Sequence, residues 1–166
     1  EKHDDIHKFY EKASFQLNDT HPTVAVAELM RILLDEENLE WDEAWEITTK
    51  TCAYTNHTIL AEALETWPMS YIQTAAPQLV PILRRLDQRA KAAHPDPRVA
   101  ILDGEDRVHM AHLDIHYGFS VNGVAQLHTD TMKHTALTPF CALHPQKLSN
   151  KTNGVNFRRS LETCDQ

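Results

Sequence analysis

The chain has 166 residues, of which 42% are hydrophobic and 24% charged, and its formal net charge is -8. This length fits one domain or part of one, and the mixture is typical of a folded protein rather than a disordered tail. The acidic balance argues against a nucleic-acid surface, which needs clustered Lys and Arg. No run of about 20 apolar residues predicts a membrane-spanning segment. We therefore predict neither a nucleic-acid partner nor a membrane partner.

Two counts in the composition are unusual: the chain has only four glycines but eleven histidines. Scarce glycine argues against a glycine-rich loop that cradles phosphate. The three cysteines, Cys52, Cys141 and Cys164, are widely spaced and form no CxxC pair. This pattern predicts reduced thiols in the cytoplasm rather than a disulfide framework.

Short strands alternate with helices in the first half of the chain. Strands are predicted at 14–17 and 52–55, and each ends in a polar cluster that leads toward a helix. After Pro22, which suits a first helical position, apolar residues up to Leu33 recur with helical spacing. Further helices are predicted at 41–49, 58–65 and 80–93. Such an order favours an open α/β sheet whose ligand site lies at the carboxyl ends of its strands.

The second half is predicted to begin with a hairpin at 99–108. A helix from Met110, a turn at 118–123 and a second helix through Met132 follow it, and the turn-rich cluster 150–154 comes last. The predicted fold class is therefore α/β, helix-rich, with short parallel strands and a hairpin.

Polar clusters at the two predicted strand ends are candidate sites. Asp19 and His21, two residues apart, can orient each other and hydrogen-bond a polar substrate, but a helix N-cap formed by Asp19 or Thr20 explains the same pattern. His57 follows the second strand, and a single histidine in that position is more often structural than catalytic.

Three histidines support a different hypothesis, that of a metal site. His112 and His116 stand four residues apart on a predicted helix, and His109 is nearby. That spacing puts two imidazoles on one helix face, as helical zinc sites require, but the ligand set is incomplete. Structural histidines remain the more economical interpretation, and we assign no metal ligands.

Longer motifs resemble those of the glycogen (α-glucan) phosphorylase family. Two of them are Asn18-Asp19-Thr20-His21-Pro22 and Tyr54-Thr55-Asn56-His57-Thr58. The matching stretches are 15–22, 28–31, 41–45, 50–58, 62–68, 110–113, 121–125, 127–128, 150–154 and 158–159. They cover nearly the whole chain in order, and members of the family are several times longer. We therefore expect residues 1–166 to be an internal fragment, the later part of a partial N-terminal glucan-binding domain.

The resemblance implies an enzyme with two Rossmann-like domains of the glycosyltransferase-B type and an active site between them. It implies phosphorolysis, in which inorganic phosphate removes a terminal α-1,4-linked glucose from a glucan as glucose 1-phosphate. The implied cofactor is pyridoxal phosphate, but its lysine has no counterpart in this chain, so the fragment alone is expected to be inactive. The family's enzymes are commonly homodimers.

The resemblance also implies roles for individual residues. His57 matches the histidine that hydrogen-bonds the 6-hydroxyl of the transferred glucose, and its backbone carbonyl faces the positive charge that develops near the anomeric carbon. The substrate-binding residues implied with it are Asp19, His21, Asn56, Thr58 and Asn153. Two alternatives are a stand-alone α/β carbohydrate-binding or interaction module without catalysis and a histidine-rich metal-binding protein.

Overall fold

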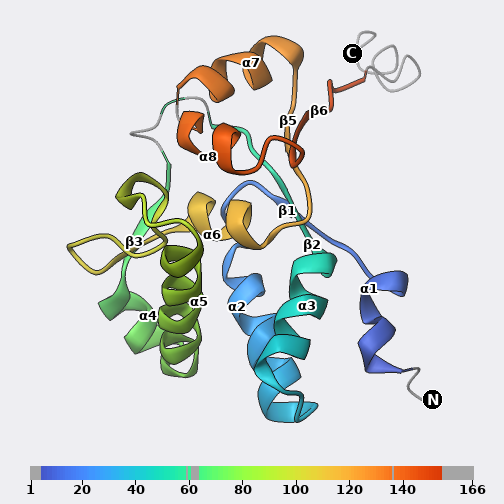
Figure 1. The fold of residues 1–166 in the computed structure, drawn as a ribbon, viewed down its shortest axis with the longest axis vertical. Coiled ribbons are helices and arrows are strands. Elements are labelled where there is room, and N and C mark those ends of the chain that lie inside the picture. Colours follow the sequence, from blue (N-terminus) through green and yellow to red (C-terminus); the bar gives the residue numbers. More distant parts are fainter. Residues whose placement is uncertain (1–4, 59, 61–63, 136, 155–166) are drawn as a thin grey trace, which may run out of the picture.

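A parallel sheet forms the centre of the mixed α/β structure seen in the computed structural model (Figure 1), which describes residues 5–58, 60, 64–135 and 137–154. Its four strands lie in the order β1-β2-β5-β6. They are β1 (Phe15–Asn18), β2 (Cys52–Thr55), β5 (Val121–Gly123) and β6 (Leu148–Asn150). Because all four strands run parallel, their carboxyl ends meet at one edge of the sheet. The predicted fold class is confirmed.

Helices pack around this sheet and supply most of the core. The central one is α2 (Val24–Arg31), which continues into the π-helical turn η2 (Ile32–Glu36) and packs against α3 (Trp41–Thr51), α5 (Val80–Ala93) and α6 (Met110–Tyr117). Figure 1 shows α2, α3 and α5 toward one end of the molecule and α7 (Gln126–His134) and α8 (Thr138–Leu143) toward the other. The remaining elements are η1 (Ile6–Lys8), α1 (Phe9–Lys12), β3 (Thr66–Pro68), α4 (Met69–Ala75), η4 (Pro77–Leu79), η5 (Pro97–Val99) and β4 (Arg107–His109).

Helix α2 shows why the chain folds in this way. The apolar face predicted after Pro22 is buried in full, with Val26, Leu29, Met30 and Leu33 all between 0% and 7% exposed. Burying one such side chain contributes roughly 1.5–3 kcal/mol, so this face outweighs the modest intrinsic preference of a short helix. No helix in the described part of the chain is both long and apolar enough to span a lipid bilayer.

Several predicted boundaries are confirmed. Strand β2 and helix α5 have the predicted bounds, β1 lies one residue further along, and α3 extends two residues further. The helix predicted at 58–65 is wrong, because the described residues Thr58, Leu60, Leu64 and Glu65 are not helical. The Asn56 side chain accepts a hydrogen bond from the Thr58 N–H at 2.9 Å, a local contact that competes with helix formation. Residues 59 and 61–63 of that prediction lie outside the described residues.

Two strand pairings differ from the sequence prediction. The second half of the turn expected at 118–123 is strand β5, which is only three residues long but is paired on both sides, with β2 and β6. The predicted hairpin forms, with an antiparallel bridge between Leu102 and Val108 and backbone hydrogen bonds from Asp103 N–H to the Arg107 carbonyl and from His109 N–H to the Ile101 carbonyl. Unexpectedly, β4 also pairs with β3, antiparallel. In both cases the partner comes from a distant part of the chain.

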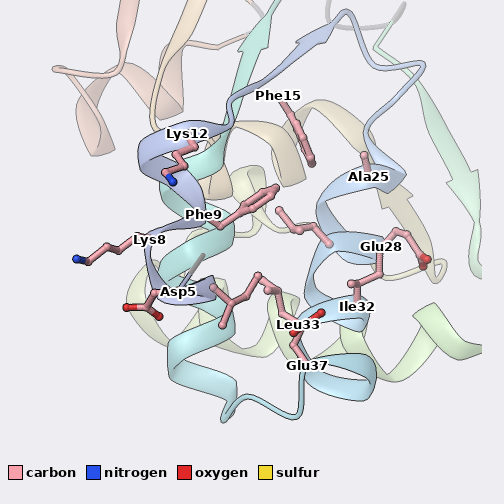
Figure 2. Close-up of a pocket in the computed structure, with 12 residues that line it drawn as sticks. Asp5, Lys8, Phe9, Lys12, Phe15, Ala25, Glu28, Ile32, Leu33 and Glu37 are labelled. Carbon is pink, nitrogen blue, oxygen red and sulfur yellow. The ribbon is translucent and has the colours of Figure 1, made fainter. Parts of the chain in front are cut away.

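A hydrophobic cavity of about 670 Å³ lies between α1 and α2 (Figure 2). Phe9 and Phe15, whose rings meet edge to face at 6.0 Å, line it together with Leu29 and Ile32. It opens beside the amino end of β1, whereas the predicted polar clusters follow the carboxyl ends of the strands. Its lining is mostly apolar, and it includes none of the candidate site residues predicted from the sequence.

The turn after α6 needs a glycine. Gly118 N–H donates to the Asp114 carbonyl at 2.7 Å, and a Cβ at position 118 would lie 2.7 Å from that same oxygen. We expect Gly118→Ala to lower the free energy of unfolding by about 1–3 kcal/mol, because the clash is with backbone that cannot rotate away. Urea unfolding measures this.

Gly104→Ala is the matched control. A Cβ there would meet nothing within 4 Å, and no described glycine has a positive φ. We expect that variant to unfold at the wild-type urea concentration or slightly above it. Equal stability of the two alanine variants would show that the backbone at Gly118 adjusts.

Candidate functional site

Polar side chains gather where β1 and β2 end. Asn18 is the last residue of β1 and pairs with Thr55, the last residue of β2. The pairing continues past the strands, because Asp19 N–H donates to the Thr55 carbonyl at 2.8 Å. His57 Nε2 lies 2.6 Å from Asn18 Oδ1. The fold therefore brings together two of the sequence-predicted clusters.

Asp19 adopts a left-handed backbone conformation with φ of 64°, one that few residues other than glycine adopt. Its Oδ1 accepts a hydrogen bond from Thr20 N–H at 2.9 Å, in the turn that precedes α2. Helix α2 itself has Thr23 as its N-cap residue and no capping bond from a side chain. The capping interpretation of Asp19 is therefore wrong for α2, although the carboxylate does hold the turn together.

Glu65 joins this turn to strand β3 and was not singled out in the sequence. Its two carboxylate oxygens accept hydrogen bonds from Thr20 Oγ1 at 2.6 Å and from Trp67 Nε1 at 2.7 Å. The hydrogen bond from Thr20 is the main cause that lowers the pKa of Glu65, with smaller help from Trp67 and the nearby His21. His21 itself is exposed at this edge.

Asn56 lies beneath the exposed His57 rather than beside it. Its side chain is 0% exposed, with Nδ2 donating to the Tyr54 hydroxyl at 2.8 Å and Oδ1 accepting from Thr58 N–H. Its own N–H donates to the Asn122 carbonyl at 2.8 Å. The backbone on both sides of His57 is therefore fixed by one buried amide.

Asn153 belongs to the segment that follows β6, at the same edge of the sheet. Its N–H donates to the Val124 carbonyl at 3.0 Å, and Lys151 N–H donates to the Gly123 carbonyl at 3.0 Å. The ladder between β5 and β6 thus continues past the strand ends, and the Asn153 side chain is exposed.

A chain of polar side chains crosses three strands just below this edge. Gln16 Nε2 donates to Thr55 Oγ1 at 2.7 Å, and Thr55 Oγ1 donates to Asn122 Oδ1 at 3.0 Å. Asn122 is not among the residues predicted from the sequence, because it lies in the predicted turn 118–123. Amide and hydroxyl side chains at the carboxyl ends of consecutive strands are the signal that could have found it.

Asp114 of α6 is buried under the site. Its Oδ2 accepts a hydrogen bond from Thr23 Oγ1 at 2.6 Å, whereas Oδ1 has no partner among the described residues. Burial raises the pKa of Asp114 to about 8, with Asp19 adding a smaller increase. The carboxyl group therefore keeps its proton at neutral pH.

The three histidines of the metal hypothesis have other partners. Ring nitrogens of His112 and His116 donate to the carbonyls of Ala100 and Val99 at 2.7 and 2.8 Å, and His109 Nε2 lies 2.9 Å from Asp103 Oδ2. Burial lowers the pKa of His112 to about 4 and also lowers that of His116. Within the described ranges, no group of three or more His, Cys, Asp or Glu side chains is placed to hold a metal ion.

The thiols of Cys52 and Cys141 are free. Burial raises the pKa of Cys52 to about 12, so this thiol is not a nucleophile at neutral pH. Cys164 lies outside the described residues.

The fold and this edge define a class of protein: part of a Rossmann-like α/β domain with its candidate ligand site at the carboxyl ends of parallel strands. A family model described as carbohydrate phosphorylase matches residues 1–166, and the chain belongs to that family. It is 53% identical over 161 residues to maltodextrin phosphorylase of Streptococcus pneumoniae. The aligned region covers 97% of this chain and 21% of that protein.

Animal relatives match nearly as well. The muscle forms of glycogen phosphorylase from Ovis aries and Homo sapiens are 46% and 44% identical over 168 residues, covering 95% of this chain and 20% of each relative. The chain thus spans about one fifth of the length of these relatives. The resemblance inferred from the motifs is confirmed.

The buried acid generates a prediction. Because the folded state keeps the proton of Asp114 while the unfolded chain releases it above about pH 4, wild-type stability falls as pH rises toward 8. Asp114→Asn removes this penalty, so we expect it to raise the free energy of unfolding at pH 7.5 by about 2–4 kcal/mol and by much less at pH 5. Urea unfolding at both pH values measures the difference.

Asp130→Asn, at an exposed position of α7, is the control and is expected to shift stability little at either pH. An Asp114→Asn effect of equal size at pH 5 and pH 7.5 would show that the acid is ionised in the folded protein.

Proposed function

We propose that this chain is the later part of the N-terminal, glucan-binding domain of an α-glucan phosphorylase. The whole protein then catalyses phosphorolysis, in which inorganic phosphate releases a terminal α-1,4-linked glucose of glycogen or maltodextrin as glucose 1-phosphate. Membership of the carbohydrate phosphorylase family and relatives named maltodextrin and glycogen phosphorylase support this proposal.

The observation that carries the proposal is the placement of His57. The residue lies exposed just past the carboxyl end of a central strand, with its backbone held by the buried Asn56 and its ring held by Asn18. A preorganised ring and carbonyl can stabilise charge without reorganising during the reaction. In this proposal, the ring binds the 6-hydroxyl of the transferred glucose, and the carbonyl stabilises the oxocarbenium-like transition state.

Residues from three strand ends bind the sugar around His57. Asp19 and His21 follow β1, Thr58 follows β2 and Asn153 follows β6, and they position the glucan in this proposal. Asn56 was expected to contact substrate as well. Its side chain faces the interior, which favours a positioning role through the backbone of His57 and Thr58.

The cofactor and phosphate sites of the proposed enzyme lie outside these 166 residues. The half-buried Lys147 does not fit a cofactor lysine, because its Nζ donates to the Ile115 and His116 carbonyls at the end of α6. We propose that the whole protein binds pyridoxal phosphate through sequence beyond this segment, where that group supplies a phosphate for proton transfer. We also propose a homodimer, and a cytoplasmic location supported by the free thiols of Cys52 and Cys141.

The test is His57→Ala in the full-length protein. We expect the turnover number for phosphorolysis to fall at least about 100-fold. The change removes a positioned polar side chain from the site and also alters the position of the residue 57 backbone carbonyl. The exposed position of His57 predicts little loss of stability. Release of glucose 1-phosphate from maltodextrin and phosphate measures the effect.

His134→Ala, at an exposed histidine in the last turn of α7, is the control and is expected to keep wild-type turnover. If His57→Ala catalysed phosphorolysis at the wild-type rate, the assignment of His57 to the active site would be wrong. A wild-type protein that releases no glucose 1-phosphate would refute the proposed function itself.

A further inference from the structure

The contact between His57 and Asn18 fixes where the ring carries its proton. The acceptor is an amide oxygen, which has lone pairs and no hydrogen, so at 2.6 Å the proton must lie on His57 Nε2. A neutral ring held in this way has its lone pair on Nδ1. Nδ1 is then able to accept a hydrogen bond, for instance from a hydroxyl group.

The side-chain amides of two asparagines, Asn56 and Asn18, restrict the conformation of His57. Asn56, buried and hydrogen-bonded through both ends of its side chain, holds the backbone on either side of the residue. Asn18 alone is in hydrogen-bond contact with the imidazole among the described side chains. The backbone carbonyl and the ring of His57 are therefore set by separate contacts.

Asn18 is itself held in place by the sheet. It pairs with Thr55 in the β1-β2 ladder, and the next residue, Asp19, continues the ladder before its left-handed backbone turns the chain away. Leu17, its neighbour in the strand, is 3% exposed and anchors the opposite face. The amide of Asn18 is thus delivered to the ring by a rigid element.

We infer that Asn18 is the positioning residue that sets the tautomer and orientation of His57, so that Nδ1 accepts a hydrogen bond from a sugar hydroxyl. This inference rests on the proposed function for the identity of the ligand. Asn18 needs no contact with the substrate. Without it, the ring rotates and divides its proton between the two nitrogens.

Other ionisable groups near this edge bear on any pH dependence. Those that act electrostatically on the neighbouring Tyr54 are Asp19 after β1, Glu65 before β3 and Asp114 of α6, and His21 acts on Glu65. All four are unchanged in the variants below. A shift in the pH profile of a position-18 variant is therefore read together with the ¹⁵N shifts of His57, which report on that ring alone.

The first experiment observes the ring directly, in full-length protein with ¹⁵N-labelled histidine rings. His57 is assigned by the loss of its signals in His57→Gln. We expect the ¹⁵N shifts at pH 8 to show a proton on Nε2 in the wild type and a mixture of tautomers in Asn18→Leu. Identical shifts in the two proteins would overturn the inference, whatever reaction the protein catalyses.

The second experiment uses the pH profile of kcat/KM for phosphorolysis. Asn18→Asp keeps an acceptor at the same place but adds a negative charge, which favours the imidazolium form of His57. In that form, His57 Nδ1 donates a hydrogen bond instead of accepting one. We expect the acidic limb of the profile to move toward higher pH by about one unit. Gln16→Met, which removes an amide from the same strand without touching the ring, is expected to keep the wild-type profile. An unmoved limb in Asn18→Asp would overturn the inference.

The third experiment tests whether the effect passes through the hydroxyl. Asn18→Leu is expected to lower kcat/KM about tenfold with glucose 1-phosphate in the synthetic direction, the cost of about one hydrogen bond. With 6-deoxyglucose 1-phosphate, which lacks the hydroxyl, the penalty is expected to fall below about threefold. An equal penalty with both sugars would show a merely structural role for Asn18 and leave the proposed function standing.

Discussion

The pairing register of β1 and β2 is the constraint on which the rest of the site depends. In a strand, successive side chains point to opposite faces, and here Leu17 is buried while Gln16 and Asn18 are exposed. A slip by one residue would bring a leucine to the place from which Asn18 reaches His57. Burial of Leu17 opposes that slip, and so does the hydrogen-bonded chain from Gln16 through Thr55 to Asn122.

A second layer of buried polar groups supports this edge from below. Asn56, Thr23 and Asp114 are each 0% exposed, and nearly all their polar atoms are paired. The exception is Asp114 Oδ1, in a carboxyl group whose pKa burial raises to about 8. A neutral acid costs far less to bury than a carboxylate, so the protein keeps a polar contact to the start of α2 without a buried charge.

Residues with strong local signals were found from the sequence, and those that depend on distant partners were not. The apolar face from Val26 to Leu33 predicted α2, and the polar clusters at two strand ends predicted the location of the candidate site. Strand β5 was missed because three residues carry too little pattern, and its two neighbours in the sheet come from elsewhere in the chain. Glu65 was missed for a similar reason, since its partners Thr20 and Trp67 include one that lies 45 residues away.

The sequence by itself determined the α/β class, the central strand β2, the helix α5 and the family, because periodicity and long motifs are properties of consecutive residues. Only the tertiary structure decided which polar residues meet. It put Asn18 against the ring of His57, turned Asn56 inward and gave the histidines of α6 backbone carbonyls as partners. The contacts of Asn18 and of the two histidines join residues far apart in the chain. All of these arrangements depend on strand register and helix packing, which local patterns do not specify.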